Sequence, residues 1–127
     1  MKCLLIVDDE VEIAKALRRL LRHDFRVEVA HTGAEALTRL EQGAIDLVLS
    51  DFRMPGMNGA ELLAQVKARW PATARAMLSG YADLDSTNSP VAEGEITRFI
   101  RKPWDDDELR ATLRTLLSEV PGAVSGP

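Results

Sequence analysis

Short apolar runs alternate with longer helix-like patterns along most of the chain. Residues 3–7 read Cys-Leu-Leu-Ile-Val, a continuously apolar run that is typical of a strand buried on both faces. Residues 13–21 then place apolar side chains at helical spacing, with Lys and Arg on the other side. Because parallel strands must be joined by long crossovers, usually helices, this repeated alternation predicts an α/β protein built on a parallel sheet.

The expected strands differ in how apolar they are, and this difference predicts their order. Residues 25–30 and 97–100 alternate between apolar and polar side chains, which is typical of half-exposed strands at the edges of a sheet. We therefore predict a five-stranded parallel sheet in the order 2-1-3-4-5 with helices on both faces, the order of flavodoxin-like folds. The five strands are expected at residues 3–7, 25–30, 45–50, 76–79 and 97–100.

Capping residues and one proline predict where helices begin or break. Thr32 and Glu35 have the spacing of a capping box, and Asn58 is expected to cap the following helix. The helix expected at 83–93 contains Pro90, which removes a backbone donor and costs ~3 kcal/mol in a helix interior. We therefore expect this helix to start late, kink or fray near the proline.

Length and charge limit the function classes. With 127 residues we expect one domain at 1–119, followed by a linker-like tail at 120–127. The formal net charge of −4 argues against direct binding of nucleic acid, which calls for a basic face. The single cysteine, Cys3, excludes an internal disulfide, and no apolar run approaches the ~18 residues of a membrane span. We expect a cytoplasmic protein that does not insert into membranes.

Residues with chemical potential follow four of the five expected strands. Asp8 and Asp9 follow the first, Asp51 the third, Ser79 ends the fourth, and Lys102 follows the fifth. Ligands of open α/β sheets bind at the carboxyl ends of the strands, and neighbouring strands lie ~4.8 Å apart, so three carboxylates should converge. Mg²⁺ would relieve their repulsion, and an aspartate can act as a nucleophile toward phosphorus. The pattern predicts phosphoryl transfer to a protein carboxylate.

Each of these residues also has an ordinary structural interpretation. Asp8 and Asp9 could only cap a helix, and Asp51 could only form a turn. Two other functions fit the same fold. One is a Mg²⁺-dependent phosphatase or phosphotransferase, which would need a second acid where the chain has Phe52 and Arg53. The other is a flavin-binding module, which would need a phosphate-binding loop where the chain is acidic after the first strand.

Four motifs together resemble the receiver domain of bacterial two-component response regulators, over about residues 2–119. The motifs are Val-Asp-Asp-Glu at 7–10, Ser-Asp-Phe-Arg-Met-Pro-Gly-Met-Asn-Gly at 50–59, Leu-Ser-Gly at 78–80 and Lys-Pro at 102–103.

The resemblance implies a role for each matching residue. Asp51 would accept a phosphoryl group from a sensor histidine kinase or a histidine phosphotransfer protein. Asp8 and Asp9 would bind Mg²⁺ together with Asp51 and the backbone carbonyl of Arg53. The peptide bond before Pro103 is expected to be cis, as in the family. The chain would be a signal receiver that catalyses only its own phosphorylation and dephosphorylation.

The resemblance also implies a switch and a tuning pair. Ser79 and Lys102 would contact the phosphoryl group, and Phe99 matches the aromatic residue whose rotamer is coupled to the hydroxyl. Arg53 and Tyr81 match two positions that tune loss of the phosphoryl group. Both are bulky here, which favours a long-lived phosphorylated state.

Partners follow from the same resemblance. The helix 4, strand 5 and helix 5 face would control a fused or separate output domain, and a second copy of the chain is a further candidate partner. Pro90 places the usual dimer mode in doubt. Residues 94–105 are similar to receivers fused to HD-GYP cyclic-di-GMP phosphodiesterase outputs. His23 and His31 have no neighbouring metal ligands in the sequence, and we interpret His31 as an ordinary loop residue.

Overall fold

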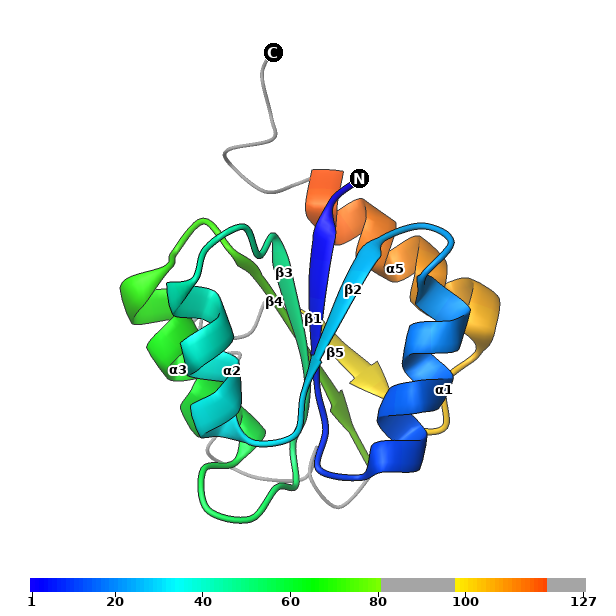
Figure 1. The fold of residues 1–127 in the computed structure, drawn as a ribbon. Helices are drawn as coiled ribbons and strands as arrows, with labels where there is room; N and C mark the ends of the chain where they lie inside the picture. The colour runs from blue at the N-terminus through cyan, green and yellow to red at the C-terminus, as the bar shows by residue number, and fades with distance from the viewer. Residues whose placement is uncertain (81–97, 119–127) are drawn as a thin grey trace.

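The computed structural model describes residues 1–80 and 98–118 (Figure 1). The helix expected at 83–93, Tyr81 and the tail at 120–127 lie outside these residues. The elements in chain order are β1 (Cys3–Val7), α1 (Val11–Leu21), β2 (Arg26–Ala30), α2 (Gly33–Glu41), β3 (Leu47–Asp51), α3 (Gly59–Arg69), β4 (Ala74–Ser79), β5 (Arg98–Arg101) and α5 (Asp106–Ser118).

The five strands form one parallel sheet in the order β2-β1-β3-β4-β5, which confirms the predicted topology. The two strands with alternating sequences, β2 and β5, are the edge strands. Val7 at the end of β1 pairs with Ala30 of β2 and with Ser50 of β3. This register brings the residues that follow these strands to one edge of the sheet.

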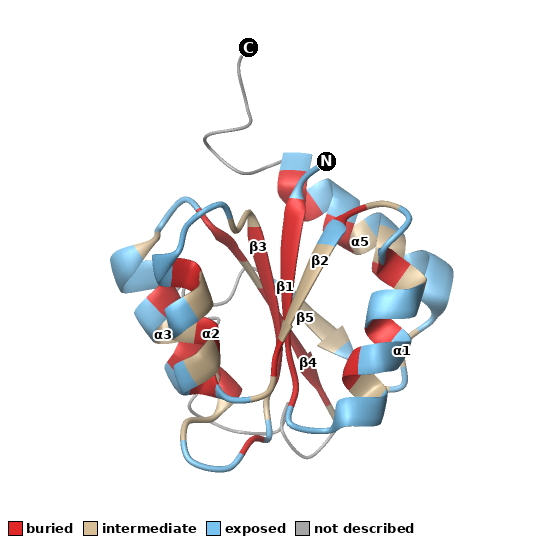
Figure 2. Cartoon of the chain, viewed as in Figure 1, coloured by how far each residue is buried: buried red, intermediate tan, exposed pale blue. Residues whose placement is uncertain are grey.

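Helices cover both faces of the sheet and create two cores. Figure 1 shows α2 and α3 on one face and α1 and α5 on the other. All five residues of β1 are buried, as a central strand with a continuously apolar sequence should be, and Figure 2 shows this burial along the middle of the sheet. Alternate residues of the central strands serve alternate cores, so Leu4 and Ile6 face α1 and α5 while Leu5 and Val7 face α2 and α3. Among the helices of the described ranges, none combines the length and apolar character that crossing a bilayer requires.

The helix starts are capped largely as predicted. Asn58 and Glu61 form a complete capping box at α3, with hydrogen bonds of 2.9 Å from the Asn58 amide and 2.8 Å from the Glu61 amide. At α2, the Thr32 hydroxyl oxygen accepts from the Glu35 amide at 3.0 Å. The Glu35 carboxylate, however, accepts from the amide of His31 at 2.9 Å instead of the Thr32 amide. Of the capping box predicted at Thr32, the bond from the Glu35 amide to the Thr32 hydroxyl is therefore present. The Glu35 carboxylate accepts from the amide one residue earlier than predicted.

The third and fourth strands have different limits from those predicted at 45–50 and 76–79. β3 begins at Leu47 and includes Asp51, and β4 begins at Ala74. The reason lies at Asp46, whose carboxylate accepts a hydrogen bond from the Cys3 amide at 2.8 Å. The Asp46 carbonyl in turn accepts from the amide of Ala74 at 3.0 Å, which extends β4 backwards to that residue. Apolar patterning alone does not detect such pairing.

Candidate functional site

Three carboxylates meet at the carboxyl edge of the sheet. Asp8 and Asp9 follow β1, Asp51 ends β3, and one oxygen from each lies within 4.8 Å of the others. Asp8 and Asp51 are buried, with exposed fractions of 1% and 3%, whereas Asp9 is exposed. The predicted convergence of these three residues is therefore present, and the cluster opens to solvent on the Asp9 side.

Asp8 is held by backbone contacts but keeps one oxygen without a partner. Its amide donates to the Ala30 carbonyl at 3.1 Å, and its Oδ1 accepts from the Glu10 amide at 2.9 Å. Its Oδ2 is buried and has no hydrogen-bond partner among the described residues. Burial raises the pKa of Asp8 to about 6, and the charge of Asp51 adds to the rise, while the Glu10 amide and Lys102 act against it.

Asp51 is fixed through its backbone and paired through its side chain. The Ser50 hydroxyl donates to the Asp51 carbonyl at 2.9 Å. Gly59, the first residue of α3, approaches that same carbonyl so closely that a Cβ there would lie 2.4 Å from the oxygen. The Asp51 carboxylate forms an ion pair with the Lys102 ammonium group. The buried carboxylate thus has a half-buried cation beside it, so its charge is paired in the interior.

Ser79 ends β4 at the same edge. Its carbonyl accepts from the Lys102 amide at 3.0 Å, so the backbone couples the hydroxyl-bearing residue to the lysine. Its side chain is fully buried, and its Oγ has no hydrogen-bond partner among the described residues. Two buried oxygens, this one and Asp8 Oδ2, thus lack partners at one edge. A cation bound by carboxylates and an oxyanion that accepts from a hydroxyl would satisfy both, so the residues present fit a divalent cation and a phosphoryl group.

The other predicted residues lie around this cluster. Arg53 is exposed in the loop after β3. Phe99 of β5 pairs with Met77 and packs against the core on the α2 and α3 side. The peptide bond between Lys102 and Pro103 is cis, as expected.

The profile of the response regulator receiver domain matches residues 4–114. The chain belongs to this family. The hydrogenase transcriptional regulatory protein HoxA of Cupriavidus necator is 41% identical over 110 residues, which cover 87% of the chain and 23% of HoxA. The chain therefore spans about a quarter of the length of this relative.

Solved receiver structures have the same fold. The signal receiver domain of an HD domain-containing protein from Pseudomonas fluorescens is 35% identical with a TM-score of 0.84, covering 95% of this chain and 90% of that one. The response regulator TrrA from Thermotoga maritima, solved in complex with Mg²⁺ and BeF, is 28% identical with a TM-score of 0.80, covering 91% and 99%. These matches agree with the signalling family and with an acidic cluster that is compatible with Mg²⁺.

Sequence reasoning missed one residue of this receiver site. His31 follows β2 directly, and its ring Nδ1 lies 3.0 Å from the Asp8 carbonyl oxygen. A signal was present in the sequence, because strands 1 and 2 were predicted as neighbours and Asp8 and His31 each follow one of them. A pattern of metal ligands does not indicate this contact, because it joins a ring nitrogen to a backbone oxygen.

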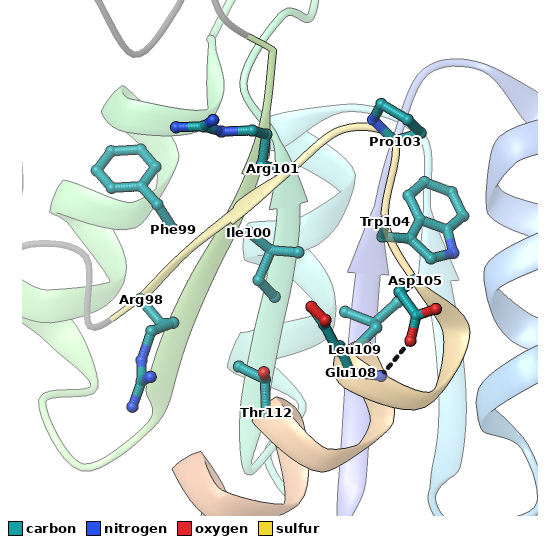
Figure 3. Close-up of a pocket in the computed structure, with 10 residues that line it drawn as sticks. All are labelled: Arg98, Phe99, Ile100, Arg101, Pro103, Trp104, Asp105, Glu108, Leu109 and Thr112. Atoms are coloured by element: carbon teal, nitrogen blue, oxygen red, sulfur yellow. Dashed lines mark hydrogen bonds between the residues drawn. The ribbon is translucent and has the colours of Figure 1, made fainter.

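A groove of about 370 Å³ lies along the receiver's edge strand (Figure 3). Figure 3 shows the side chains of Ile100, Leu109 and Glu108 near the middle of the view, with Trp104 and Arg98 farther out on opposite sides. Phe99 and Ile100 lie on opposite sides of β5 and pack against different cores. The side chains of the edge strand β5 therefore contact the core on the α3 side and also line the groove beside α5.

Proposed function

We propose that Asp51 is the phosphoacceptor of this receiver and that Asp8, Asp9 and Asp51 hold Mg²⁺ together with the backbone carbonyl of Arg53. The observation that carries this proposal is the convergence of the three carboxylates within 4.8 Å. Their negative charges repel when no cation is bound, and the pKa of Asp8 is raised, first by burial and further by the charge of Asp51. When bound, Mg²⁺ supplies positive charge for these carboxylates and for the oxygens of a phosphoryl group.

The reaction is a transfer from the histidine of a sensor kinase or a histidine phosphotransfer protein. A carboxylate oxygen of Asp51 attacks phosphorus and forms the new P–O bond. The bond from phosphorus to the imidazole nitrogen breaks, and its electron pair stays on the imidazole. Lys102, already paired with Asp51, supplies a positive charge beside the transferred group. The chain would act on itself only, with no turnover of free phosphate esters.

The Ser79 hydroxyl, which has no partner among the residues that the structure describes, is suited to detect the product. Once Asp51 carries a phosphoryl group, the hydroxyl gains an acceptor and moves toward it. The main chain of Ser79 is bonded to that of Lys102, at the end of the strand that carries Phe99. A shift at Ser79 would therefore bias the position of Phe99 and the groove beside α5.

The output that this groove controls belongs to the proposal as well. HoxA is named as a transcriptional regulator, and the similar Pseudomonas receiver comes from an HD domain-containing protein. Both relatives support control of a fused output, and the Pseudomonas protein supports one with an HD domain, of which the HD-GYP kind is our proposal. A separate output protein and a second copy of the chain are the alternative partners. Arg53 and Tyr81, both bulky, would slow the approach of the water that removes the phosphoryl group.

Intact-mass measurement tests the site assignment. Incubation with acetyl phosphate and Mg²⁺ should add one phosphoryl group, and EDTA should prevent the addition. Asp51→Asn should lower the incorporation at least about a hundredfold, because the nucleophilic oxygen is lost.

Asp46→Asn is the matched control. It changes the same residue type at the other end of the strand and keeps an oxygen for the Cys3 amide. Incorporation by Asp51→Asn at the wild-type level would refute Asp51 as the acceptor.

A further inference from the structure

His31 is the first residue after β2, and its ring reaches the loop that follows β1. The register pairs Val7 with Ala30, which places His31 beside Asp8. The ring Nδ1 lies 3.0 Å from the Asp8 carbonyl oxygen. Because a carbonyl oxygen can only accept, the hydrogen of this bond must belong to Nδ1. His31 is therefore a donor toward the backbone of the acidic cluster.

This bond restrains the peptide unit that joins two of the clustered residues. The Asp8 carbonyl and the Asp9 amide lie in one rigid plane, since the peptide bond between them does not rotate freely. Fixing the carbonyl oxygen therefore fixes the backbone directions from which both side chains leave. A rotation of this plane would change the positions of both carboxylates relative to Asp51.

The bond also completes the restraint of Asp8. The amide of Asp8 is held by the Ala30 carbonyl, and its Oδ1 is held by the Glu10 amide. His31 holds its carbonyl, which leaves Oδ2 as the polar atom of Asp8 without a partner among residues 1–80 and 98–118. Three contacts thus orient the residue so that a single oxygen remains for a ligand.

His31 is itself anchored by the following helix. Its amide donates to the Glu35 carboxylate at 2.9 Å, and the Glu35 amide donates to the Thr32 hydroxyl at 3.0 Å. The shifted capping arrangement at α2 therefore fixes the backbone from which the imidazole extends. His31 is half-buried.

We propose that His31 is a positioning residue whose Nδ1–H sets the orientation of the Asp8–Asp9 pair and thereby the affinity of the cluster for a divalent cation. This inference rests on the proposed function in one respect, namely that the cluster binds such a cation. Partners that orient metal ligands typically change metal affinity by about 10–100-fold when removed. We expect the lower end, about tenfold, because His31 acts through the backbone.

Two variants of similar size separate the donor from the volume of the side chain. His31→Leu removes the N–H, whereas His31→Asn keeps an N–H on the δ atom. Mg²⁺ would be titrated into each protein at fixed pH, with tryptophan fluorescence and calorimetry as readouts. We expect about tenfold weaker binding for His31→Leu and binding within about twofold of wild type for His31→Asn. His23→Leu, at an exposed histidine after α1, is the control and should not change the affinity.

A second readout reports the hydrogen bond without any metal. The ¹⁵N resonance of the Asp9 amide senses polarisation of the Asp8 carbonyl, so it should move in metal-free His31→Leu and stay near its wild-type position in His31→Asn. Wild-type affinity in His31→Leu, or equal weakening in both variants, would overturn the donor role while leaving the proposed function standing. If the wild-type protein bound no Mg²⁺, the proposed function would fail and the proposed effect on affinity with it. An Asp9 resonance unchanged in His31→Leu would then also reject the hydrogen bond itself.

Discussion

Two aspartates at opposite edges of the same sheet have opposite relations to their surroundings. At the amino edge, the Asp46 carboxylate accepts from the Cys3 amide, its amide donates to the Cys3 carbonyl, and its carbonyl accepts from the Ala74 amide. Asp46 thus ties β1, β3 and β4 together. At the carboxyl edge, Asp8 is more deeply buried, yet its Oδ2 has no partner among the described residues and its pKa is raised to about 6.

The two edges differ in whether their buried polar atoms have hydrogen-bond partners when no ligand is bound. The amide, the carbonyl and one carboxylate oxygen of Asp46 have hydrogen-bond partners within the protein, and these bonds add to stability. The carboxyl edge instead keeps one carboxylate oxygen of Asp8, Oδ2, and the hydroxyl of Ser79 buried without a partner in the described part of the chain. Such groups lower stability unless something external completes them. Conflicts between stability and local structure are expected at functional sites, and here they lie at the edge where phosphoryl chemistry is proposed.

Asp8→Asn should therefore stabilise the metal-free protein. Asp8 has a pKa of about 6 in the fold against an ordinary value of 3.8 for aspartate, so between these values the native state holds a proton that the unfolded chain has lost. The wild-type free energy of unfolding falls as the pH rises through this window, by up to about 3 kcal/mol. Asparagine remains neutral and keeps an oxygen for the Glu10 amide. In EDTA, we expect the variant to gain up to about 3 kcal/mol at pH 8 and almost nothing at pH 4.

Urea unfolding at the two pH values measures this gain, and Mg²⁺ provides the control. The metal should stabilise the wild type in proportion to its binding and have little effect on Asp8→Asn. A variant that is less stable than wild type at pH 8 in EDTA would show that the buried charge is already compensated.

Asp46→Ala should have the opposite sign and a somewhat smaller effect. The variant leaves the Cys3 amide without its acceptor at the start of the central strand. A lost partner of this kind typically lowers the free energy of unfolding by about 1–3 kcal/mol. Phosphoryl incorporation per folded molecule should not change, because the site lies at the other edge. A gain in stability would remove the contrast between the two edges.

The fold and the carboxylate cluster at the carboxyl edge could be predicted from the sequence, whereas the bonds of Asp46 at the amino edge could not. Apolar runs and helical spacing were sufficient for the order of the strands, because one continuous apolar run and two alternating ones distinguish central from edge strands. The same order brought Asp8, Asp9 and Asp51 together, since residues after neighbouring parallel strands share an edge. These are consequences of periodicity and topology, which a sequence records directly.

The unpredicted features depend on individual hydrogen bonds. The carboxylate of Asp46 and the ring of His31 each contact a backbone group more than twenty residues away in sequence. Neither contact leaves a repeating pattern, and either residue alone is ordinary in a loop. The shift of the Glu35 carboxylate from Thr32 to His31 is a similar case, because both amides are within reach of one flexible side chain.

Ser79→Ala and Ser50→Ala form the most sensitive comparison, with the smallest effects. Both serines are fully buried near Asp51, but the Ser50 hydroxyl donates to the Asp51 carbonyl at 2.9 Å, whereas the Ser79 hydroxyl has no partner among the described residues. Ser50→Ala should lower the free energy of unfolding by about 1 kcal/mol, and Ser79→Ala should leave it unchanged or raise it by less than about 1 kcal/mol. Adding beryllofluoride with Mg²⁺ should stabilise the protein partly by giving the Ser79 hydroxyl an acceptor. The increase in the free energy of unfolding on this addition should therefore be smaller for Ser79→Ala than for Ser50→Ala. Equal destabilisation by the two substitutions in EDTA would mean that the Ser79 hydroxyl already has a hydrogen-bond partner. The contrast between the two edges of the sheet would then not hold at Ser79.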